Sequence, residues 1–239
     1  MQRVPAVWQR RLLLLILAGI SACAGIPQNR SDSALPDWAA PRVTEVENPE
    51  VLDASAFIAY RMLTRSDFRG QHPVPELSAY ADRLGAITCA FIQTSLGGIW
   101  VEFREPSDGE RVYRATPQGL RFEALMDPDC SWWNPGDLGL PASYVLRHEQ
   151  IHFAIFELEV RKMNARVPEL EARFTATAGT QEAAIELLQQ QLEEAHTLFN
   201  ERVLVRSRAF DEDTSMGHRP KAQALWWSRI NAELSSTPD

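Results

Sequence analysis

The fold is constrained most by a long segment in which apolar residues recur at the period of an α-helix. The segment starts at Pro141, a residue suited to the first turn of a helix, and runs through Val145 and Ile151 to about Val167. A helix with such a face has to bury it against another layer of structure. The pattern therefore predicts a long packed helix in the second half of the chain.

Two more helices are expected after this one. Thr180 can cap the first of them, and the apolar residues that follow keep a spacing of three and four. These residues are Ile185, Leu188, Leu192, Ala195 and Phe199. The last helix is expected over roughly Lys221–Leu234.

The first half of the chain predicts a small antiparallel sheet. Four segments rich in strand formers are separated by turn sequences, namely Ala86–Gln93, Gly98–Glu105, Glu110–Ala115 and Leu120–Met126. Ser55–Thr64 can be either a strand or a short helix. The expected fold class is α+β, with a sheet over about 50–133 followed by helices over about 141–239.

The long helix contains His148-Glu149-Gln150-Ile151-His152, which has the pattern His-Glu-x-x-His. Residues four apart lie on one helical face, so His148 and His152 can converge on one metal ion. Glu149 lies about 100° around the helix from His148, where its carboxylate borders a metal-bound water. The motif predicts a Zn²⁺ site in which a zinc-activated water attacks a peptide bond and Glu149 is the general base.

A third protein ligand is required, because two histidines alone hold zinc poorly. Glu157 points to another side of the helix and Glu159 lies about 10 Å further along it, so the ligand has to come from another segment. If the long helix and the next one pack antiparallel around a short connection, residues near 194–196 lie level with His152. The candidates there are Glu193, Glu194 and His196.

Together these features resemble DUF922, a family of bacterial zinc-dependent proteases grouped with the gluzincin- and aspzincin-like peptidases. The resemblance covers about Leu120 to Leu234. It rests on Ser131-Trp132, Leu146–Phe153, Glu157 with Arg161, Phe210–Gly217, and Gln223 with Trp226. It implies a zincin-like metalloprotease domain over 50–239 that acts on peptide or protein substrates.

The resemblance also implies that the loop after the second helix completes the metal site. Asp213 matches the acidic position of the family pattern and is the expected third ligand. Asp211, His218, His196 and Glu193 stay open as alternative ligands, although Asp211 can also simply end or cap an element. Met216 stands where the family pattern has histidine, and His218 can take its place. If that histidine is essential, the chain is a catalytically degenerate zinc-binding or interaction lipoprotein, which is the alternative to an active enzyme.

Substrate binding is expected along a sheet edge, because zinc proteases commonly bind peptides as an added strand. Leu120–Trp133 leads into the helix and is the candidate edge. Trp132 and Trp133 either line the cleft there or cap the core. Tyr144, four residues before His148, either borders the cleft or packs. Trp132 and Tyr144 are therefore the candidate substrate-binding residues.

Residues 1–23 have the pattern of a bacterial lipoprotein signal peptide. Arginines precede a short apolar run, and Ile20-Ser21-Ala22-Cys23 resembles a lipobox in which Cys23 is lipidated. Ala24 favours the outer membrane, with the protein on the periplasmic side. Residues 24–49 are polar with scattered prolines, as in a flexible tether.

The net charge and the cysteines limit which ligands, membrane contacts and covalent links the chain can have. The net charge of −8 argues against a nucleic-acid binder, which needs a basic patch to neutralise phosphates. An acidic chain is held at a membrane by its lipid and not by anionic headgroups. Cys89 and Cys130 would mature in an oxidising compartment, where a disulfide is favoured over two buried thiols.

Overall fold

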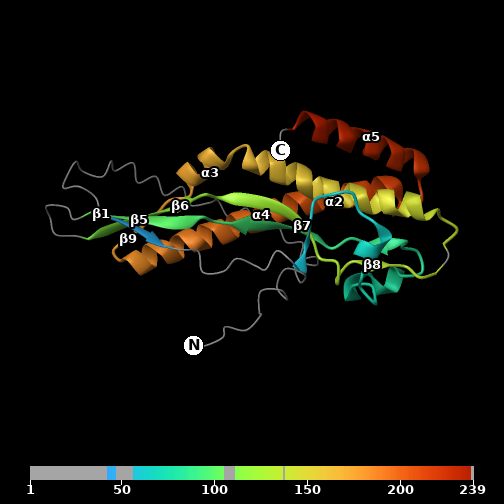
Figure 1. Cartoon of the computed structure of the whole chain (residues 1–239), viewed down its shortest axis with the longest axis horizontal. Helices are drawn as coiled ribbons and strands as arrows, with labels where there is room; N and C mark the ends of the chain where they lie inside the picture. Colours follow the sequence, from blue (N-terminus) through green and yellow to red (C-terminus); the bar gives the residue numbers. More distant parts are fainter. Residues whose placement is uncertain (1–41, 47–55, 105–110, 137, 238–239) are drawn as a thin grey trace. The chain divides into compact units, whose positions relative to one another are not determined.

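The computed structural model describes residues 42–46, 56–104, 111–136 and 138–237. All of them belong to one compact unit, Trp38–Asp239. This unit has the predicted α+β class, with antiparallel sheets in its first part and long helices in its second part (Figure 1). The predicted signal peptide and Cys23 lie outside the described residues. Within the described part, no helix combines the length and the apolar character needed to cross a membrane.

The strands form three sheets in place of the single one expected. The largest has the order β1-β5-β6-β9, built from Arg42–Val46, Gly98–Arg104, Val112–Gln118 and Ala176–Ala178. The second has the order β2-β7-β4, built from Ile58–Ala59, Arg121–Met126 and Ala90–Ser95. The third pairs β3 (Ala86–Ile87) with β8 (Trp132–Trp133). All of these strand pairs are antiparallel.

Several strands differ from the sequence-based expectation. The segment 86–93 is not one strand but divides between β3 and β4, which belong to different sheets. β1 lies inside the segment 24–49 that was expected to be a tether, and it pairs with β5 along its whole length. Five residues are too short a pattern to stand out before the partner strand is known. The rest of 24–49 lies outside the described residues.

The helices follow the expected order, with one addition. α2 covers Ala142–Asn164, α4 covers Gln181–Thr214 and α5 covers Pro220–Ser236. Thr180 caps α4 as expected, because its hydroxyl accepts a hydrogen bond from the Ala183 amide at 3.2 Å. The addition is a short helix, α3 (Val167–Arg173), which together with β9 fills the connection between α2 and α4.

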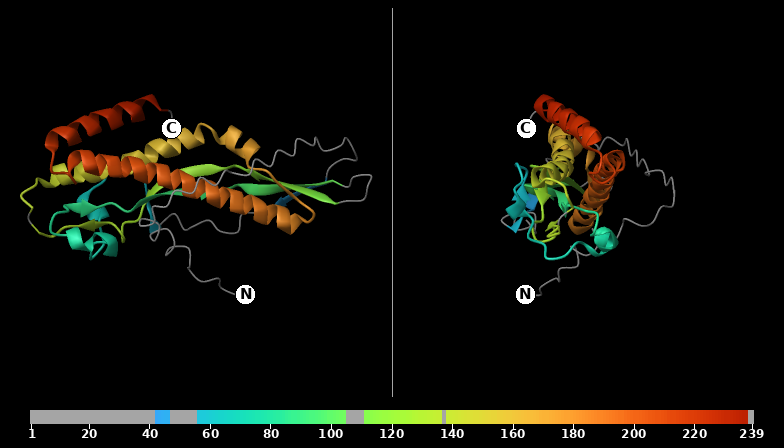
Figure 2. Two further views of the ribbon diagram at one scale, coloured as in Figure 1. Left: turned by 180° about the vertical axis from the view of Figure 1, so that it is seen from behind. Right: turned by 90° about the vertical axis from the view of Figure 1, so that its right-hand side faces the viewer.

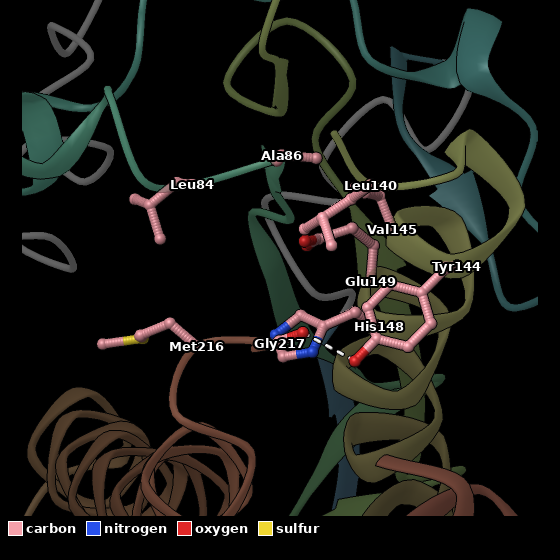
Figure 3. Close-up of a pocket in the computed structure, with 10 residues that line it drawn as sticks. Leu84, Ala86, Leu140, Tyr144, Val145, His148, Glu149, Met216 and Gly217 are labelled. Atoms are coloured by element: carbon pink, nitrogen blue, oxygen red, sulfur yellow. Dashed lines mark hydrogen bonds between the residues drawn. The ribbon is translucent and has the colours of Figure 1, made fainter. Parts of the chain in front are cut away.

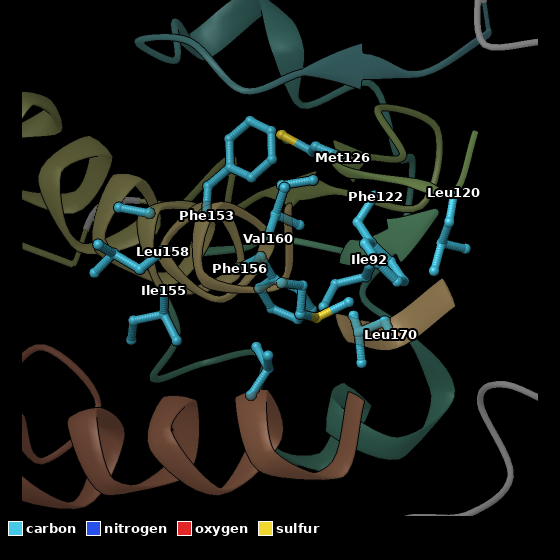
Figure 4. Close-up of a cluster of buried hydrophobic side chains, with 14 of the residues drawn as sticks. Ile92, Leu120, Phe122, Met126, Phe153, Ile155, Phe156, Leu158, Val160 and Leu170 are labelled. Carbon is cyan, nitrogen blue, oxygen red and sulfur yellow. The ribbon is translucent and has the colours of Figure 1, made fainter. Parts of the chain in front are cut away.

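α2 is the central element of the fold. It contacts β7 and β4 on one side and the helices α4 and α5 on others (Figure 2). Its apolar side chains Phe153, Phe156 and Val160 are buried in one cluster with Met126 and Ile92 from the sheet (Figure 4). Burial on several sides fixes both the axis and the rotation of α2. The direction in which each α2 side chain points is therefore determined by the core.

A disulfide joins Cys89 to Cys130, as predicted, with 5.8 Å between the two Cα atoms. Cys89 lies between β3 and β4, and Cys130 lies just before β8. The amide of Cys89 also donates to the Ser131 hydroxyl at 2.9 Å. The bond therefore holds the junction of two sheets together, directly beside Thr88.

Candidate metal centre

Three side chains from two helices bring their donor atoms to one point. The Nε2 atoms of His148 and His152 on α2 lie 3.2 Å apart. Oδ1 of Asp211 on α4 lies 3.2 Å from the first and 3.1 Å from the second. Tetrahedral zinc with bonds of about 2.0–2.1 Å places its ligand atoms about 3.3 Å apart. This group could therefore hold a metal ion and leave one coordination position open.

The acidic member of the group is Asp211 and not the expected Asp213. The predicted loop does not begin before Ser215, because α4 continues as a helix through Thr214. Two residues rotate a helix by about 200°, so Asp211 faces α2 while Asp213 faces away. Oδ2 of Asp213 instead accepts a hydrogen bond from the Trp226 indole at 2.9 Å. Asp213 thus ties α5 to α4 and takes no part in the group.

The other candidate ligands also lie elsewhere. His196 Nε2 lies 2.8 Å from the carbonyl oxygen of Ile92, and His218 Nε2 lies 3.2 Å from that of Arg83. Glu193 and Glu194 are exposed on α4. α4 does run antiparallel to α2, but the connection contains α3 and β9 and is not short. In consequence Ser207, and not 194–196, lies level with His152.

Each histidine has a partner on its second ring nitrogen. His152 Nδ1 lies 2.7 Å from the Ser207 hydroxyl, and His148 Nδ1 lies 3.2 Å from the side-chain oxygen of Gln223. Gln223 is 1% exposed, and its amide nitrogen donates to the Tyr144 carbonyl at 2.9 Å. An Nδ1–H that donates to such a partner leaves Nε2 free to bind a metal, which fixes the useful tautomer.

Buried packing supports the same two rings. Phe210 is fully buried, and its ring centroid lies 4.4 Å from that of His148 and 4.9 Å from that of His152. The neighbour of Phe210 on the other side is Trp226. The role of Phe210 and Ser207 was not predicted. A signal for Ser207 exists, because it precedes Asp211 by four residues and so shares its helical face.

The turn after α4 closes over His148. Ser215, Met216 and Gly217 all have positive φ, and a Cβ on Gly217 would lie 3.4 Å from His148 Nδ1. The Gly217 carbonyl accepts a hydrogen bond of 2.6 Å from the Tyr144 hydroxyl (Figure 3). The Met216 side chain is 49% exposed and extends away from the His148 ring (Figure 3). The turn thus approaches the metal-binding group through its backbone.

Glu149 borders a cavity beside this group. The cavity holds about 290 Å³ of space, open solvent included, and His148, Glu149, Tyr144, Met216, Leu84 and Leu140 are among its lining residues. Glu149 is 3% exposed, and its Oε2 accepts a hydrogen bond of 2.7 Å from the Thr88 hydroxyl. A buried carboxylate therefore lies next to the metal-binding group and faces the same cavity.

The two predicted substrate-binding residues have different places. Tyr144 lines the cavity, whereas Trp132 is 5% exposed and packs in a small core cluster with Leu84 and Ile87. The expectation for Trp132 is corrected, because its pairing with β3 turns the ring into the core. β7 pairs with β4 along its whole length and with β2 at Leu125 and Met126 only. The cavity is instead bordered by Leu84–Ala86, the segment that leads into β3.

The charges of the group support one another. Burial raises the pKa of Asp211, but the charge of His152 and hydrogen bonds from both histidines outweigh burial and bring the pKa well below its usual range. Burial lowers the pKa of His152, but the charges of Asp211 and Glu149 outweigh it and raise the pKa. Asp211 is therefore ionised at neutral pH and offers an anionic ligand atom to a metal ion. At His152 a proton competes with the metal ion for the ring nitrogen.

Comparison of the chain with protein-family models, with curated proteins and with solved structures finds no match. The resemblance to DUF922 proteases stays a prediction. The possible function is therefore inferred from the geometry of the site.

Proposed function

We propose that this protein is a zinc-dependent metalloendopeptidase. The observation that carries the proposal is the triangle of donor atoms from His148, His152 and Asp211, with edges of 3.1–3.2 Å, next to the buried carboxylate of Glu149. Three protein ligands and one open position are typical of catalytic zinc sites, whereas structural sites use four. The resemblance of residues 120–234 to DUF922 proteases points in the same direction.

Zinc is the metal that fits this donor set best. Two imidazole nitrogens and one carboxylate oxygen suit a borderline-soft ion, whereas Ca²⁺ and Mg²⁺ prefer all-oxygen sites. When bound, zinc supplies Lewis-acid chemistry that activates water and polarises a carbonyl group. His148, His152 and Asp211 would hold it, and Gln223 and Ser207 would keep the two rings in position.

Glu149 is the proposed general base. It precedes Gln150 in the motif and faces the cavity, where a substrate carbonyl has to lie. Its carboxylate can take a proton from water and later deliver it to the leaving amine. The hydrogen bond from Thr88 at 2.7 Å occupies one lone pair of Oε2 and orients the carboxylate for this transfer.

We also propose that the protein is a lipoprotein of the cell envelope, anchored through Cys23 to the outer membrane and facing the periplasm. The pattern of residues 1–23 supports this location. A disulfide between Cys89 and Cys130 agrees with an oxidising compartment. Its substrates are then peptides or proteins of the envelope.

The alternative is a chain that binds zinc but has lost catalysis. It is favoured by Met216, which extends away from the His148 ring where the family pattern has a histidine (Figure 3). His218 cannot replace that residue while its Nε2 lies 3.2 Å from the Arg83 carbonyl. If the alternative holds, Met216→His raises proteolysis from a negligible baseline.

The experiment compares the full chain with Glu149→Gln and Met216→His, each measured for zinc content and for cleavage of casein. An active enzyme should bind about one zinc per chain in all three forms, and Glu149→Gln should lower the cleavage rate by at least about 100-fold. Equal cleavage rates for wild type and Glu149→Gln would contradict the enzyme proposal. Zinc binding without cleavage, restored by Met216→His, supports the alternative.

A further inference from the structure

A second cavity adjoins the one beside Glu149. It holds about 610 Å³ of space, open solvent included, and the two cavities share Gly85, Leu140 and Val145 as lining residues. Gly85 is required there, because a Cβ on it would lie 2.7 Å from a Val145 methyl group. A peptide that reaches Glu149 therefore has room to place a neighbouring side chain in the second cavity.

Arg65 gives this second cavity a positive charge. Its guanidinium carbon lies 5.3 Å from the centroid of the Trp133 ring, and both residues line the cavity. Trp133 is in turn held by an edge contact with Phe68, with 5.5 Å between centroids. A guanidinium over an indole face gains cation–π attraction and has a restricted orientation.

Arg65 differs from the two other arginines of its segment. Arg61 pairs with Asp67 at 2.7 Å and Arg69 pairs with Asp129 at 3.1 Å. No carboxylate of the described residues forms an ion pair with Arg65. In a chain of net charge −8, a cation that lines a cavity and has no ion pair within the described residues attracts an anionic ligand.

The segment that carries Arg65 is fixed to the proposed catalytic helix. Gln150, which follows Glu149 on α2, is 1% exposed. Its side-chain oxygen accepts from the Leu63 amide at 2.7 Å, and its side-chain nitrogen donates to the Arg61 carbonyl at 3.1 Å. The backbone shortly before Arg65 is therefore hydrogen-bonded to α2 at the residue next to Glu149.

We propose that Arg65 binds a carboxylate of the substrate, so that the protein selects peptides with an acidic group near the cleaved bond. This inference rests on the proposed peptidase function. The planar fork of arginine matches a carboxylate with two parallel hydrogen bonds. The carboxylate can belong to a glutamate or aspartate side chain or to the carboxyl terminus of the substrate.

The test uses the full chain loaded with zinc and internally quenched peptides that are blocked at both ends. Members of each pair differ only by glutamate or glutamine at one position near the cleaved bond. Wild type should cleave the glutamate member of one pair at least about tenfold faster in kcat/KM. A second set of peptides has free carboxyl termini and distinguishes the two sources of the carboxylate. If the carboxyl terminus is the group that binds, the free peptide is cleaved faster than its blocked form, and the choice of glutamate or glutamine makes no difference.

Variants assign the preference to Arg65. Arg65→Gln should abolish it by lowering kcat/KM for the glutamate peptide to the value for the glutamine peptide, and Arg65→Lys should keep part of the preference. Arg69→Gln is the matched control, because it removes a charge four residues away that already has a partner. A preference that survives in Arg65→Gln, or that wild type lacks for both peptide sets, overturns the inference.

Failure of the proposed function remains distinguishable from failure of this inference. If wild type cleaves no peptide, the peptidase proposal is lost, and the binding of the same labelled peptides to Glu149→Gln is measured by fluorescence anisotropy. The acidic peptide should bind about tenfold more tightly than the neutral one, and adding Arg65→Gln should remove the difference. Equal affinities contradict the carboxylate subsite.

Discussion

Asp211 and Asp213 are two residues apart on α4 and have unrelated roles. Oδ1 of Asp211 lies 3.1–3.2 Å from both histidine Nε2 atoms, whereas Oδ2 of Asp213 accepts a hydrogen bond from Trp226. The difference follows from helix rotation alone, because both are carboxylates of similar flexibility. The pair therefore offers a matched test of the metal-binding group.

We expect Asp211→Asn to weaken zinc binding by at least about 100-fold, since a neutral amide replaces an anionic donor. Asp213→Asn should keep zinc affinity and lower the free energy of unfolding by about 1 kcal/mol through the altered bond to Trp226. Zinc affinity is measured by competition with a chelator, and stability by urea unfolding of the metal-free protein. Equal zinc affinity of the two variants contradicts the assigned ligand.

His148, Glu149 and His152 could be predicted because the motif is local and its geometry is set by one helix. Asp211 could not be singled out from the other candidate ligands, because the residue that faces the two histidines depends on where α4 ends and on how far α4 is shifted along α2. The partners Gln223 and Ser207 come from two further positions in the chain. Their polar side chains are ordinary in sequence and gain meaning only when the helices are in contact.

At the scale of elements, the shift between α2 and α4 comes from their connection. α3 (Val167–Arg173) and β9 (Ala176–Ala178) occupy it, and β9 adds the fourth strand to the sheet of β6. A three-residue strand carries too little periodicity to be recognised. The long helices, the strands β5 and β6 and the cap at Thr180 were predictable because each is encoded by a local pattern.

The turn η2 (Arg65–Asp67) that carries Arg65 should be sensitive to acid. A hydrogen bond from Arg61, with amide and hydroxyl bonds from Thr64, lowers the pKa of Asp67 from 3.8 to about 2. Because folding lowers the pKa of Asp67, the ionised carboxylate stabilises the folded state. This stabilisation is complete above about pH 4 and is lost as the pH falls through about 2.

We therefore expect Asp67→Asn to lower the free energy of unfolding by about 1–2 kcal/mol at pH 7, after allowance for the half-exposed Arg61 partner. The loss should be smaller at pH 2.5, where the wild-type carboxylate is itself losing its advantage. Urea unfolding of both proteins at the two pH values measures this. A difference between the two proteins that does not change with pH speaks against the ion pair.

For the whole molecule, the disulfide is the only covalent link between distant parts of the described chain. It closes a loop with a sequence separation of 41 residues and joins the β3–β4 junction to the segment before β8. Closing a loop of this length stabilises a fold by about 2–4 kcal/mol, mainly by restricting the unfolded chain. The sheets that surround the site thus depend on an oxidising environment.

Adding a reductant should therefore lower the free energy of unfolding of the wild type by about 2–4 kcal/mol. A variant with both Cys89→Ser and Cys130→Ser should have the lower stability from the start and should not respond to the reductant. Urea unfolding with and without reductant separates the two. A response of equal size in the double variant assigns the effect to something other than this bond.

Gln150 occupies a position of the His-Glu-x-x-His pattern that is usually free to vary, yet here both ends of its amide hold the backbone at Arg61 and Leu63. One side chain thus connects α2, which carries the proposed general base Glu149, to the segment that carries the proposed specificity residue Arg65. Because catalysis and specificity would both depend on this amide, they could not change independently. Over evolutionary time, new specificity in this scaffold would have to arise by substitution of other residues, with Gln150 retained.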